Sequence, residues 1–271
     1  MVSPPIFLDY NATTPVAPEV LEAMLPMLRE HFGNPSSSHP YGRQAEEALK
    51  RARGQVAALI GAAPGEILFT GSATEADNLA ILGVAEALKG RGRHLITSAV
   101  EHPAVARPMA HLAERGWDVT VLPVDETGQV SPRDLAQALR EDTVLVSVMH
   151  ANNEVGTLQP IAELAALARA RGVLFHTDAA QSVGKVPVAV DALGVDLLTI
   201  AGHKLYAPKG VGALYLRAGT PIVPIQYGAG QEHGLRPGTE NVAHNVGLGA
   251  AAALANNRLP DGADRLRERR G

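Results

Sequence analysis

Between Glu66 and Leu216 the sequence alternates short apolar runs with amphipathic segments, and this alternation constrains the fold more than any other feature. The apolar runs predict strands over residues 66–70, 94–98, 118–122, 143–149, 173–177, 196–200 and 212–216. The amphipathic segments predict helices over residues 74–89, 103–115, 131–140 and 160–171. Such alternation indicates an α/β fold with a mostly parallel sheet that helices cover on both faces.

The flanking segments complete the predicted organisation. Residues 1–14 are expected to form an extended N-terminal arm, residues 15–255 one large domain, and residues 256–271 the start of a surface helix. Two helices precede the alternating region. The first, over 18–31, has an apolar face of Leu21, Met24, Leu25 and Leu28. The second, over 42–60, has an apolar face of Ala45, Leu49, Ala52, Val56, Leu59 and Ile60.

Composition limits the classes of partner and chemistry. The 271 residues are 46% hydrophobic and have a formal net charge of −4, which gives no reason to expect a nucleic-acid or membrane partner. We find no signal-peptide pattern and no apolar run long enough to span a membrane, so a cytoplasmic location is expected. The sequence contains no cysteine, which excludes disulfides, cysteine metal sites and cysteine nucleophiles within these residues. No metal site is predicted.

Two polar residues follow neighbouring apolar runs. Asp178 comes directly after the run 173–177, and Lys204 follows the run 196–200 after a short Ala-Gly-His segment. Open α/β sheets bind ligands beyond the carboxyl ends of their strands, where both side chains are expected. Lysine forms Schiff bases with carbonyls, and a carboxylate keeps a pyridine nitrogen protonated. Together they indicate pyridoxal phosphate (PLP). Taken singly, Lys204 also fits a solvated loop and Asp178 a helix cap.

The segment that follows strand 66–70 has the pattern of an anion site. Ser72, Ala73 and Thr74 open a helix, whose free N–H groups and positive dipole end bind phosphate readily. The alternative is an ordinary N-cap by Ser72 or Thr74, with Glu75 favouring the first turn. His102 also follows a strand, and it fits either a polar cap or a functional imidazole.

Eight segments then carry a resemblance to a known family. They are LDYNATTP, FGNPSSSH, GSATEADNLAI, TSAVEHPAV, MHANNEVGTLQPI, HTDAAQSVGK, AGHKLYAPKGVGALY and GLRPGTENV, and they extend from about Phe7 to about Leu254. In this order they resemble cysteine desulfurases of the NifS/IscS-like group within the class V aminotransferases. The resemblance implies the large domain of a PLP-dependent transferase of fold type I, with a seven-stranded sheet, and a reaction that takes sulfur from L-cysteine for iron–sulfur cluster or thio-cofactor synthesis.

The resemblance also implies roles for single residues. Lys204 matches the Schiff-base and catalytic lysine, and His102 matches a histidine that stacks on the pyridine ring and can transfer a proton. Asp178 matches the partner of the ring nitrogen, and Gln181 the donor to the phenolate oxygen. The other implied contacts are Ala73, Thr74 and His203 to the phosphate, and Asn153 beside the cofactor hydroxyl and the substrate carboxylate. His176 is expected to be a satisfied core histidine.

The glycine-rich stretch Gly228–Asn241 has two interpretations. As sequence alone it fits a flexible connector. In the family this loop crosses a two-fold interface, where the residue at Thr239 bonds the phosphate of the partner's cofactor. The resemblance therefore implies a homodimer with shared active sites. Arg236 could pair with an acidic residue across that interface.

The chain departs from the family pattern in two places. Ala201 stands where the family commonly has a serine that holds the phosphate, and Gly71-Ser72 reverses the usual Ser-Gly order. Ser72 could compensate for the lost hydroxyl. The family's nucleophilic cysteine and its carboxylate-binding arginine lie in a C-terminal domain, for which these residues have no counterpart. A truncated sequence, a separate subunit, a PLP lyase or aminotransferase that needs no cysteine, and a non-catalytic assembly partner are all open.

Overall fold

The computed structural model describes residues 5–270, with side chains as far as Leu259. Seven strands form one sheet in the order β1-β7-β6-β5-β4-β2-β3. Their bounds are β1 Ile67–Thr70, β2 His94–Ser98, β3 Asp118–Leu122, β4 Thr143–Ser147, β5 Leu174–Asp178, β6 Leu197–Ala201 and β7 Gly212–Leu216. All seven strands lie where the apolar runs predict them, within two residues at either end.

The sheet is mostly parallel, as predicted. Strands β3, β2, β4, β5 and β6 pair in parallel, whereas β7 runs antiparallel between β6 and β1. The carboxyl ends of β4, β5 and β6 therefore meet at one edge. Parallel strands are buried on both faces, which explains why all five residues of β4 and of β6 are buried.

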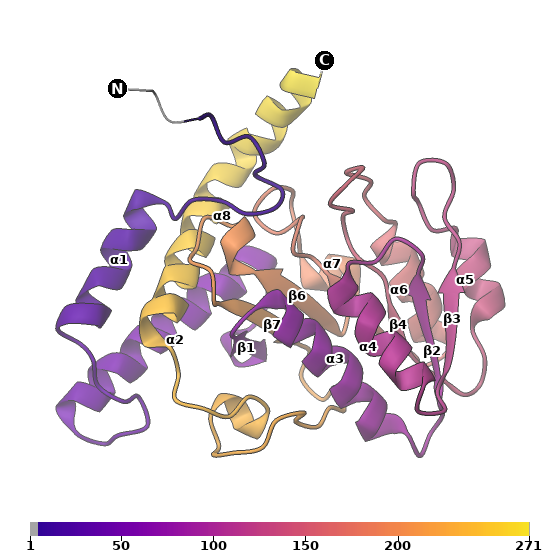
Figure 1. Ribbon diagram of the computed structural model, residues 1–271, viewed down its shortest axis with the longest axis horizontal. Coiled ribbons are helices and arrows are strands. Elements are labelled where there is room, and N and C mark those ends of the chain that lie inside the picture. The colour runs from indigo at the N-terminus through magenta and orange to yellow at the C-terminus, as the bar shows by residue number, and fades with distance from the viewer. Residues whose placement is uncertain (1–4, 271) are drawn as a thin grey trace.

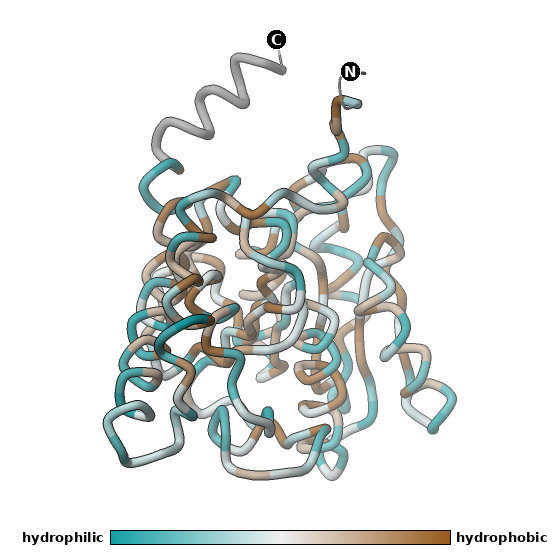
Figure 2. Tube along the Cα trace, turned by 60° about the vertical axis from the view of Figure 1, so that its left-hand side comes forward, coloured by the Kyte–Doolittle hydropathy of each residue, from teal (hydrophilic) through white to brown (hydrophobic). Residues whose placement is uncertain are grey.

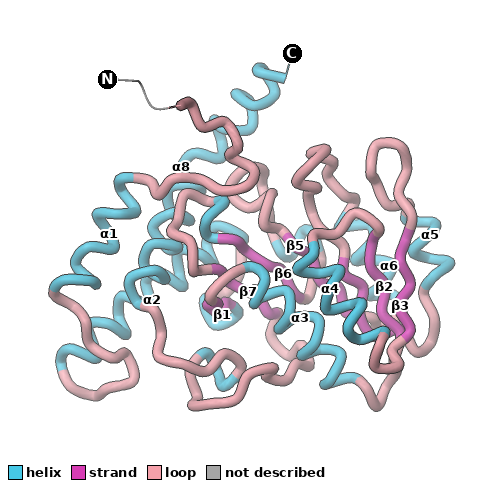
Figure 3. Tube along the Cα trace, viewed as in Figure 1, coloured by secondary structure: helices cyan, strands magenta, loops and turns pink. Residues whose placement is uncertain are grey.

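Helices cover both faces of the sheet (Figures 1 and 3). Their bounds are α1 Pro18–Arg29, α2 Pro40–Ile60, α3 Ala73–Leu88, α4 Pro103–Ala113, α5 Pro132–Ala138, α6 Ile161–Ala170, α7 Val190–Leu193 and α8 Val242–Arg270, with 3-10 turns η1 Pro64–Glu66, η2 Gly202–Lys204 and η3 Glu232–Gly234. Apolar residues of α3 and α4 form one core with one face of the sheet. Residues of α2, α6 and α8 form a second core with the other face.

The two N-terminal helices differ in how well sequence predicts their buried faces. Every apolar residue predicted for the second helix is buried in α2, which begins after the cap of His39 and ends at Gly61 in the left-handed region (φ 68°). In α1 the prediction is right only for Met24, which is buried, whereas Leu21 and Leu28 are 47% and 59% exposed. The other buried residue of α1 is Val20, which the predicted face did not include.

The predicted C-terminal helix starts earlier than expected. Helix α8 begins at Val242 rather than at Asn256, and its first turns belong to the large domain because they pack on α2 and α1. The expected boundary at residue 256 therefore falls inside a continuous helix. Residue 271 lies outside the described residues.

The N-terminal arm, over the described residues 5–14, has neither helix nor strand and runs across the sheet edge at which β5 and β6 end (Figure 1). Its apolar residues Ile6 and Leu8 are 85% and 83% exposed, and Figure 2 shows this apolar segment next to the N-terminus. Within the part of the chain that the structure describes, no helix has the length and apolarity needed to cross a membrane.

Candidate active site

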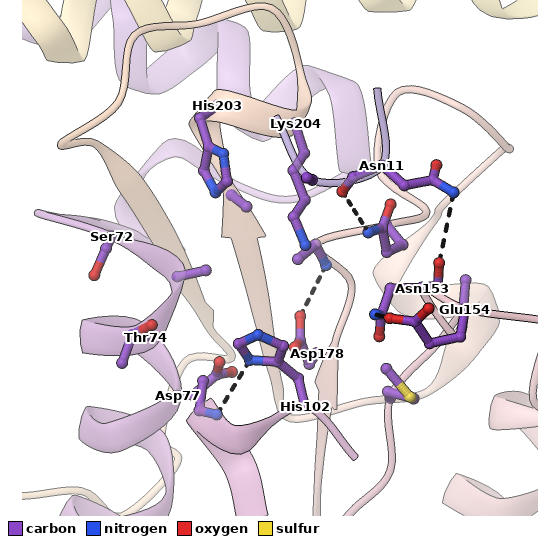
Figure 4. A pocket seen from close by; sticks show the side chains of 18 of the residues that line it. Asn11, Ser72, Thr74, Asp77, His102, Asn153, Glu154, Asp178, His203 and Lys204 are labelled. Atoms are coloured by element: carbon purple, nitrogen blue, oxygen red, sulfur yellow. Dashed lines mark hydrogen bonds between the residues drawn. The ribbon is translucent and has the colours of Figure 1, made fainter. Parts of the chain in front are cut away.

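A cavity of about 570 Å³ lies at the carboxyl ends of β5 and β6, against the first turns of α3 and α4 (Figure 4). It brings together every site residue that sequence analysis predicts, except Thr239. These lining residues are Ala73, Thr74, His102, Asn153, Asp178, Gln181, His203 and Lys204. Figure 4 shows the side chains of Lys204, Asp178 and His102 pointing into the same space.

Asp178 is the last residue of β5 and is only 5% exposed. Burial raises the pKa of its carboxyl, while a hydrogen bond from the Ala180 N–H to Oδ1 (2.9 Å) and the charges of Lys204 and His102 act in the opposite direction. An added positive charge inside the cavity would favour the ionised carboxylate further. Asp178 is thus suited to a cationic ligand atom such as a protonated ring nitrogen.

Lys204 closes the 3-10 turn η2, which follows β6 directly. Gly202 makes this turn possible, since a Cβ at that position would lie 2.7 Å from the carbonyl oxygen of Val211. The neighbouring His203 is held by a contact between Nδ1 and the Thr13 hydroxyl (3.2 Å). Burial, followed by the charges of Lys204 and Lys209, lowers the pKa of His203. The imidazole is therefore neutral near pH 7 and can donate one N–H.

The first turn of α3 forms one wall of the cavity. The Ser72 hydroxyl accepts a hydrogen bond from the Glu75 N–H (3.1 Å), which confirms the N-cap interpretation. The N–H groups of Ala73 and Thr74 have no partner within the helix and remain available to an anion. Glu75 does not compete for them, because its carboxylate bonds the Gly71 N–H and Arg236. The cap by Ser72 therefore leaves the N–H groups of the predicted anion site free.

His102 is the N-cap of α4, where its Nδ1 accepts a hydrogen bond from the Ala104 N–H (3.1 Å). This bond fixes the ring and leaves Nε2 to carry the proton of the neutral form. The side chain also lines the cavity. The two interpretations of His102, helix cap and cavity residue, therefore hold together.

Amide side chains line the opposite wall. Gln181 Nε2 donates to the carbonyl oxygen of Asn11 (3.0 Å), which ties the N-terminal arm to the cavity. Asn153 Nδ2 donates to Glu154 Oε1 (2.6 Å), so Glu154 is the structural partner of that amide. Asn152 forms the turn, since its Oδ1 accepts from the backbone N–H groups of Glu154 and Val155.

Sequence analysis missed two buried acidic residues, one that lines the cavity and one that precedes the lining residue His102. Asp77, in α3, lines the cavity and is fully buried, and its carboxyl oxygens make no hydrogen bond of normal geometry within the described residues. Burial and the nearby Asp178 raise the pKa of Asp77 well above its ordinary value. Its Oδ1 lies 3.5 Å from Nε2 of His176. A neutral, protonated Asp77 is the form that this environment favours.

His176 itself is a buried core histidine, as predicted. Its ring nitrogens contact the hydroxyls of Ser147 (2.8 Å) and Thr199 (3.1 Å). Burial lowers its pKa to about 3, so the ring is neutral at any pH near 7.

Glu101 is the second acidic residue that sequence analysis missed. Its Oε1 accepts hydrogen bonds from the Ser98 hydroxyl (2.5 Å) and the Met149 N–H (2.9 Å), whereas Oε2 is buried without a partner in the described part of the chain. Burial raises its pKa to about 8. The sequence could have indicated Glu101, because it lies near the end of a predicted strand and directly precedes His102.

Thr239 lies apart from the cavity, in a small depression of about 130 Å³ that it shares with Arg236 and Glu240. Within this chain the guanidinium of Arg236 pairs with Glu75 (2.8 Å), a partner that sequence analysis did not name. This pair joins the glycine-rich loop to the first turn of α3.

The aminotransferase class-V family matches residues 6–264. The chain belongs to this family. Among its curated relatives, cysteine desulfurase IscS of Dictyoglomus turgidum is 54% identical over 98% of this chain and 67% of that protein. Cysteine desulfurase IscS of Methanosarcina thermophila is 48% identical over 94% of this chain and 63% of that protein. The chain therefore spans about two thirds of the length of these relatives.

Solved structures agree with this assignment. A NifS-like protein superposes with a TM-score of 0.94 at 42% identity, over 97% of this chain and 74% of that one. A structure described as SspA in complex with cysteine superposes with a TM-score of 0.88 at 44% identity, over 91% of this chain and 72% of that one. The predicted fold is confirmed.

Class-V aminotransferases and cysteine desulfurases are PLP-dependent enzymes, and the cavity of this family member fits that cofactor. The cavity offers the amine of Lys204 to an aldehyde, the buried carboxylate of Asp178 to a ring nitrogen, and the free N-terminus of α3 to a phosphate. The close approach of α3 to the sheet depends on Gly212, where a Cβ would lie 2.7 Å from the Ser72 carbonyl carbon. A larger residue at Gly212 would displace the first turn of α3.

Proposed function

We propose that this chain forms the PLP-binding part of a cysteine desulfurase, which converts L-cysteine to L-alanine and passes the sulfur to a thiol. The observation that carries the proposal is the meeting of Lys204 and Asp178 in one cavity at the ends of adjacent strands. The cysteine desulfurase relatives and the SspA structure, which is described in complex with cysteine, support L-cysteine as the substrate.

The proposed positions of the cofactor follow from the donors in the cavity. The N–H groups of Ala73 and Thr74, with neutral His203, would hold the phosphate. Asp178 would bond the ring nitrogen and His102 would stack on the ring. Gln181 would donate to the phenolate oxygen, and Asn153 would bind the substrate carboxylate.

When bound, PLP supplies an aldehyde for an amine and a ring that draws electron density from the substrate Cα. Asp178 keeps a proton on the ring nitrogen, because a buried carboxylate stabilises a neighbouring cation. Lys204 is the base that takes the proton from the substrate Cα, and it can return that proton to the product. His102 Nε2 lies in the same cavity and can exchange a proton with the substrate thiol.

The sulfur-accepting step needs a thiol from outside these residues, since the sequence contains no cysteine. The reaction balances as L-cysteine plus a protein thiol giving L-alanine plus a protein persulfide. The thiolate attacks the substrate sulfur, the carbon–sulfur bond breaks, and Cβ receives a proton. A cysteine thiolate is suited to this attack because it is nucleophilic near neutral pH. We propose that an acceptor protein then uses the sulfur for iron–sulfur cluster or thio-cofactor synthesis.

We further propose a homodimer in which Thr239 reaches the cofactor phosphate of the partner subunit. The support is its position: Thr239 lies outside the cavity of its own chain, although the other eight predicted residues line it. A cytoplasmic location stays a prediction.

The test measures cofactor binding and substrate turnover separately. We expect PLP to give a visible absorption band that L-cysteine changes, and alanine to form when a cysteine-containing acceptor is supplied. In Asp178→Asn the amide keeps the bond from Ala180, but loss of the charge should weaken PLP binding about 10- to 100-fold. Bound PLP that gives a keto acid by transamination, or that does not respond to L-cysteine, would contradict the proposal.

A further inference from the structure

We propose that Lys185 is a positioning residue that fixes the side-chain amide of Gln181, so that the amide nitrogen faces the cavity as a polarised donor to an anionic oxygen. The inference deepens the proposed function and rests on it. It is drawn from two hydrogen bonds at opposite ends of one amide.

The two hydrogen bonds define the orientation of Gln181. Lys185 Nζ donates to Gln181 Oε1 (2.7 Å), and Gln181 Nε2 donates to the Asn11 carbonyl (3.0 Å). An ammonium group can only donate and a carbonyl can only accept, so both contacts exclude the flipped amide. The second N–H of Nε2 remains for a ligand. Asn11 and Gln181 line the cavity whereas Lys185 does not, so the lysine approaches the amide from the protein side.

A tight turn returns Lys185 to Gln181. The Lys185 N–H bonds the Ser182 carbonyl (3.0 Å), and Gly184 occupies the left-handed region (φ 76°). A Cβ at Gly184 would lie 2.1 Å from Cδ1 of Leu205, the residue after Lys204. The turn is thus packed against the segment that carries Lys204, which fixes the position of the backbone at Lys185.

The environment of Lys185 is unfavourable for a lysine that only supports the fold. Its Nζ bonds a neutral amide, and burial followed by the charge of Lys204 lowers the pKa of Lys185 to about 8. Lys185 is only partly buried, and a partly desolvated cation beside a neutral acceptor is less stable than one that further negative charge compensates. An anionic oxygen bonded to Gln181 Nε2 would supply a compensating negative charge, and the polarised amide would transmit its effect to Lys185. Hydrogen bonds in such a chain strengthen one another.

The oxygen that fits this donor is the phenolate of PLP. A polarised N–H beside a phenolate stabilises its unprotonated form, and the positive charge behind the amide disfavours protonation nearby. Loss of Lys185 should therefore weaken PLP binding about fivefold and raise the pH midpoint of the visible absorption band by about half a unit.

The test is a double-mutant cycle on the full chain with added PLP. Lys185→Met removes the donor at similar length, Lys185→Arg keeps a cationic donor, and Gln181→Leu removes the amide. We expect Lys185→Met to raise the PLP Kd and the pH midpoint, and Lys185→Arg to restore most of both. In the Gln181→Leu background, Lys185→Met should change neither.

Equal effects of Lys185→Met in both backgrounds would overturn the inference, because Lys185 would then act without Gln181. No effect on the unsubstituted chain would also overturn it and would leave the proposed function standing. Failure of the unsubstituted chain to bind PLP would overturn both. If Lys185→Met does not fold, Lys185→Gln tests the charge, since it removes the cation at similar length; it should raise the pH midpoint, and an unchanged midpoint would overturn the inference.

Discussion

The cavity wall at the ends of β5 and β6 and the glycine-rich loop 228–241 carry two parts of the same predicted site, and they are built differently. At the wall, Asp178 and Lys204 are held by adjacent strands of one chain. On the loop, Thr239 lies outside that chain's own cavity. Strand ends are therefore enough to place Asp178 and Lys204, whereas the role proposed for Thr239 depends on where the loop is held.

The loop is anchored to the large domain. Arg53 of α2 forms two hydrogen bonds with the buried carboxylate of Glu232 (2.6 and 2.7 Å), and Glu232 also accepts from the Phe69 N–H (2.9 Å). Glu232 and His233 both have positive φ (45° and 60°), a conformation that costs energy for residues other than glycine. These contacts argue against the flexible connector, and Arg236 adds a second anchor at α3.

The largest expected effect lies at the wall. Lys204→Ala removes the amine that attaches the aldehyde, so no covalent PLP adduct should form. Borohydride reduction followed by mass measurement of the chain tests this directly. The matched control is Lys209→Ala, since Lys209 is an exposed lysine of the same segment. An adduct that persists in Lys204→Ala, or one that disappears in Lys209→Ala, would show that PLP attaches to a different lysine.

The next effect lies on the loop side. Arg53→Ala leaves the carboxylate of Glu232 buried without its partner, which should lower the free energy of unfolding by about 3–5 kcal/mol. Urea unfolding of the chain without cofactor measures this. Lys50→Ala is the control on the same helix, because the Lys50–Glu46 pair is exposed (69% and 46%) and should contribute less than about 1 kcal/mol. Similar losses in both variants would mean that the anchor is not energetically special.

The stability of the chain should also depend on pH through Glu101, a buried residue beside the cavity residue His102, whose pKa is raised from 4.5 to about 8. Between these values the folded chain binds more protons at Glu101 than the unfolded chain does. The free energy of unfolding should therefore fall as pH rises through this window, by at most about 4 kcal/mol from this group. Glu101→Gln should flatten that slope in urea unfolding from pH 5 to 8, and an unchanged slope would assign it to other groups.

Sequence predicted the sheet and most of the wall for physical reasons. Strands buried on both faces leave uninterrupted apolar runs, and the polar residue after each run marks the edge where ligands bind. The predicted face of α1 was only partly right because Met24 lies at helical spacing from Val20 on one side and from Leu21 and Leu28 on the other. Periodicity identifies an apolar face, but only tertiary contacts decide which face is covered.

The missed residues share a different cause. Asn11 belongs to an irregular arm and reaches the cavity through a bond to Gln181, 170 residues away in sequence, which no local pattern indicates. Asp77 lies in the first turns of α3, where acidic residues are common because they stabilise the helix dipole, so its presence there indicates no function. Its burial depends on β5 and β6, so the sequence alone could not distinguish it from an ordinary helix residue.

The smallest expected effect concerns Ala201, which is 3% exposed and lines the cavity at the end of β6. Ala201→Ser would add a hydroxyl facing the phosphate, and PLP should bind about tenfold more tightly by absorption titration.

The Ser72 hydroxyl accepts from Glu75, so its proton is free to bond the same anion. Ser72 could compensate for the serine that the family commonly has at position 201. In that case Ser72→Ala should weaken PLP binding more when residue 201 is alanine than in the Ala201→Ser background. Equal losses in the two backgrounds would show that Ser72 acts only as the cap of α3, and that the phosphate is held by the helix N–H groups and His203 alone.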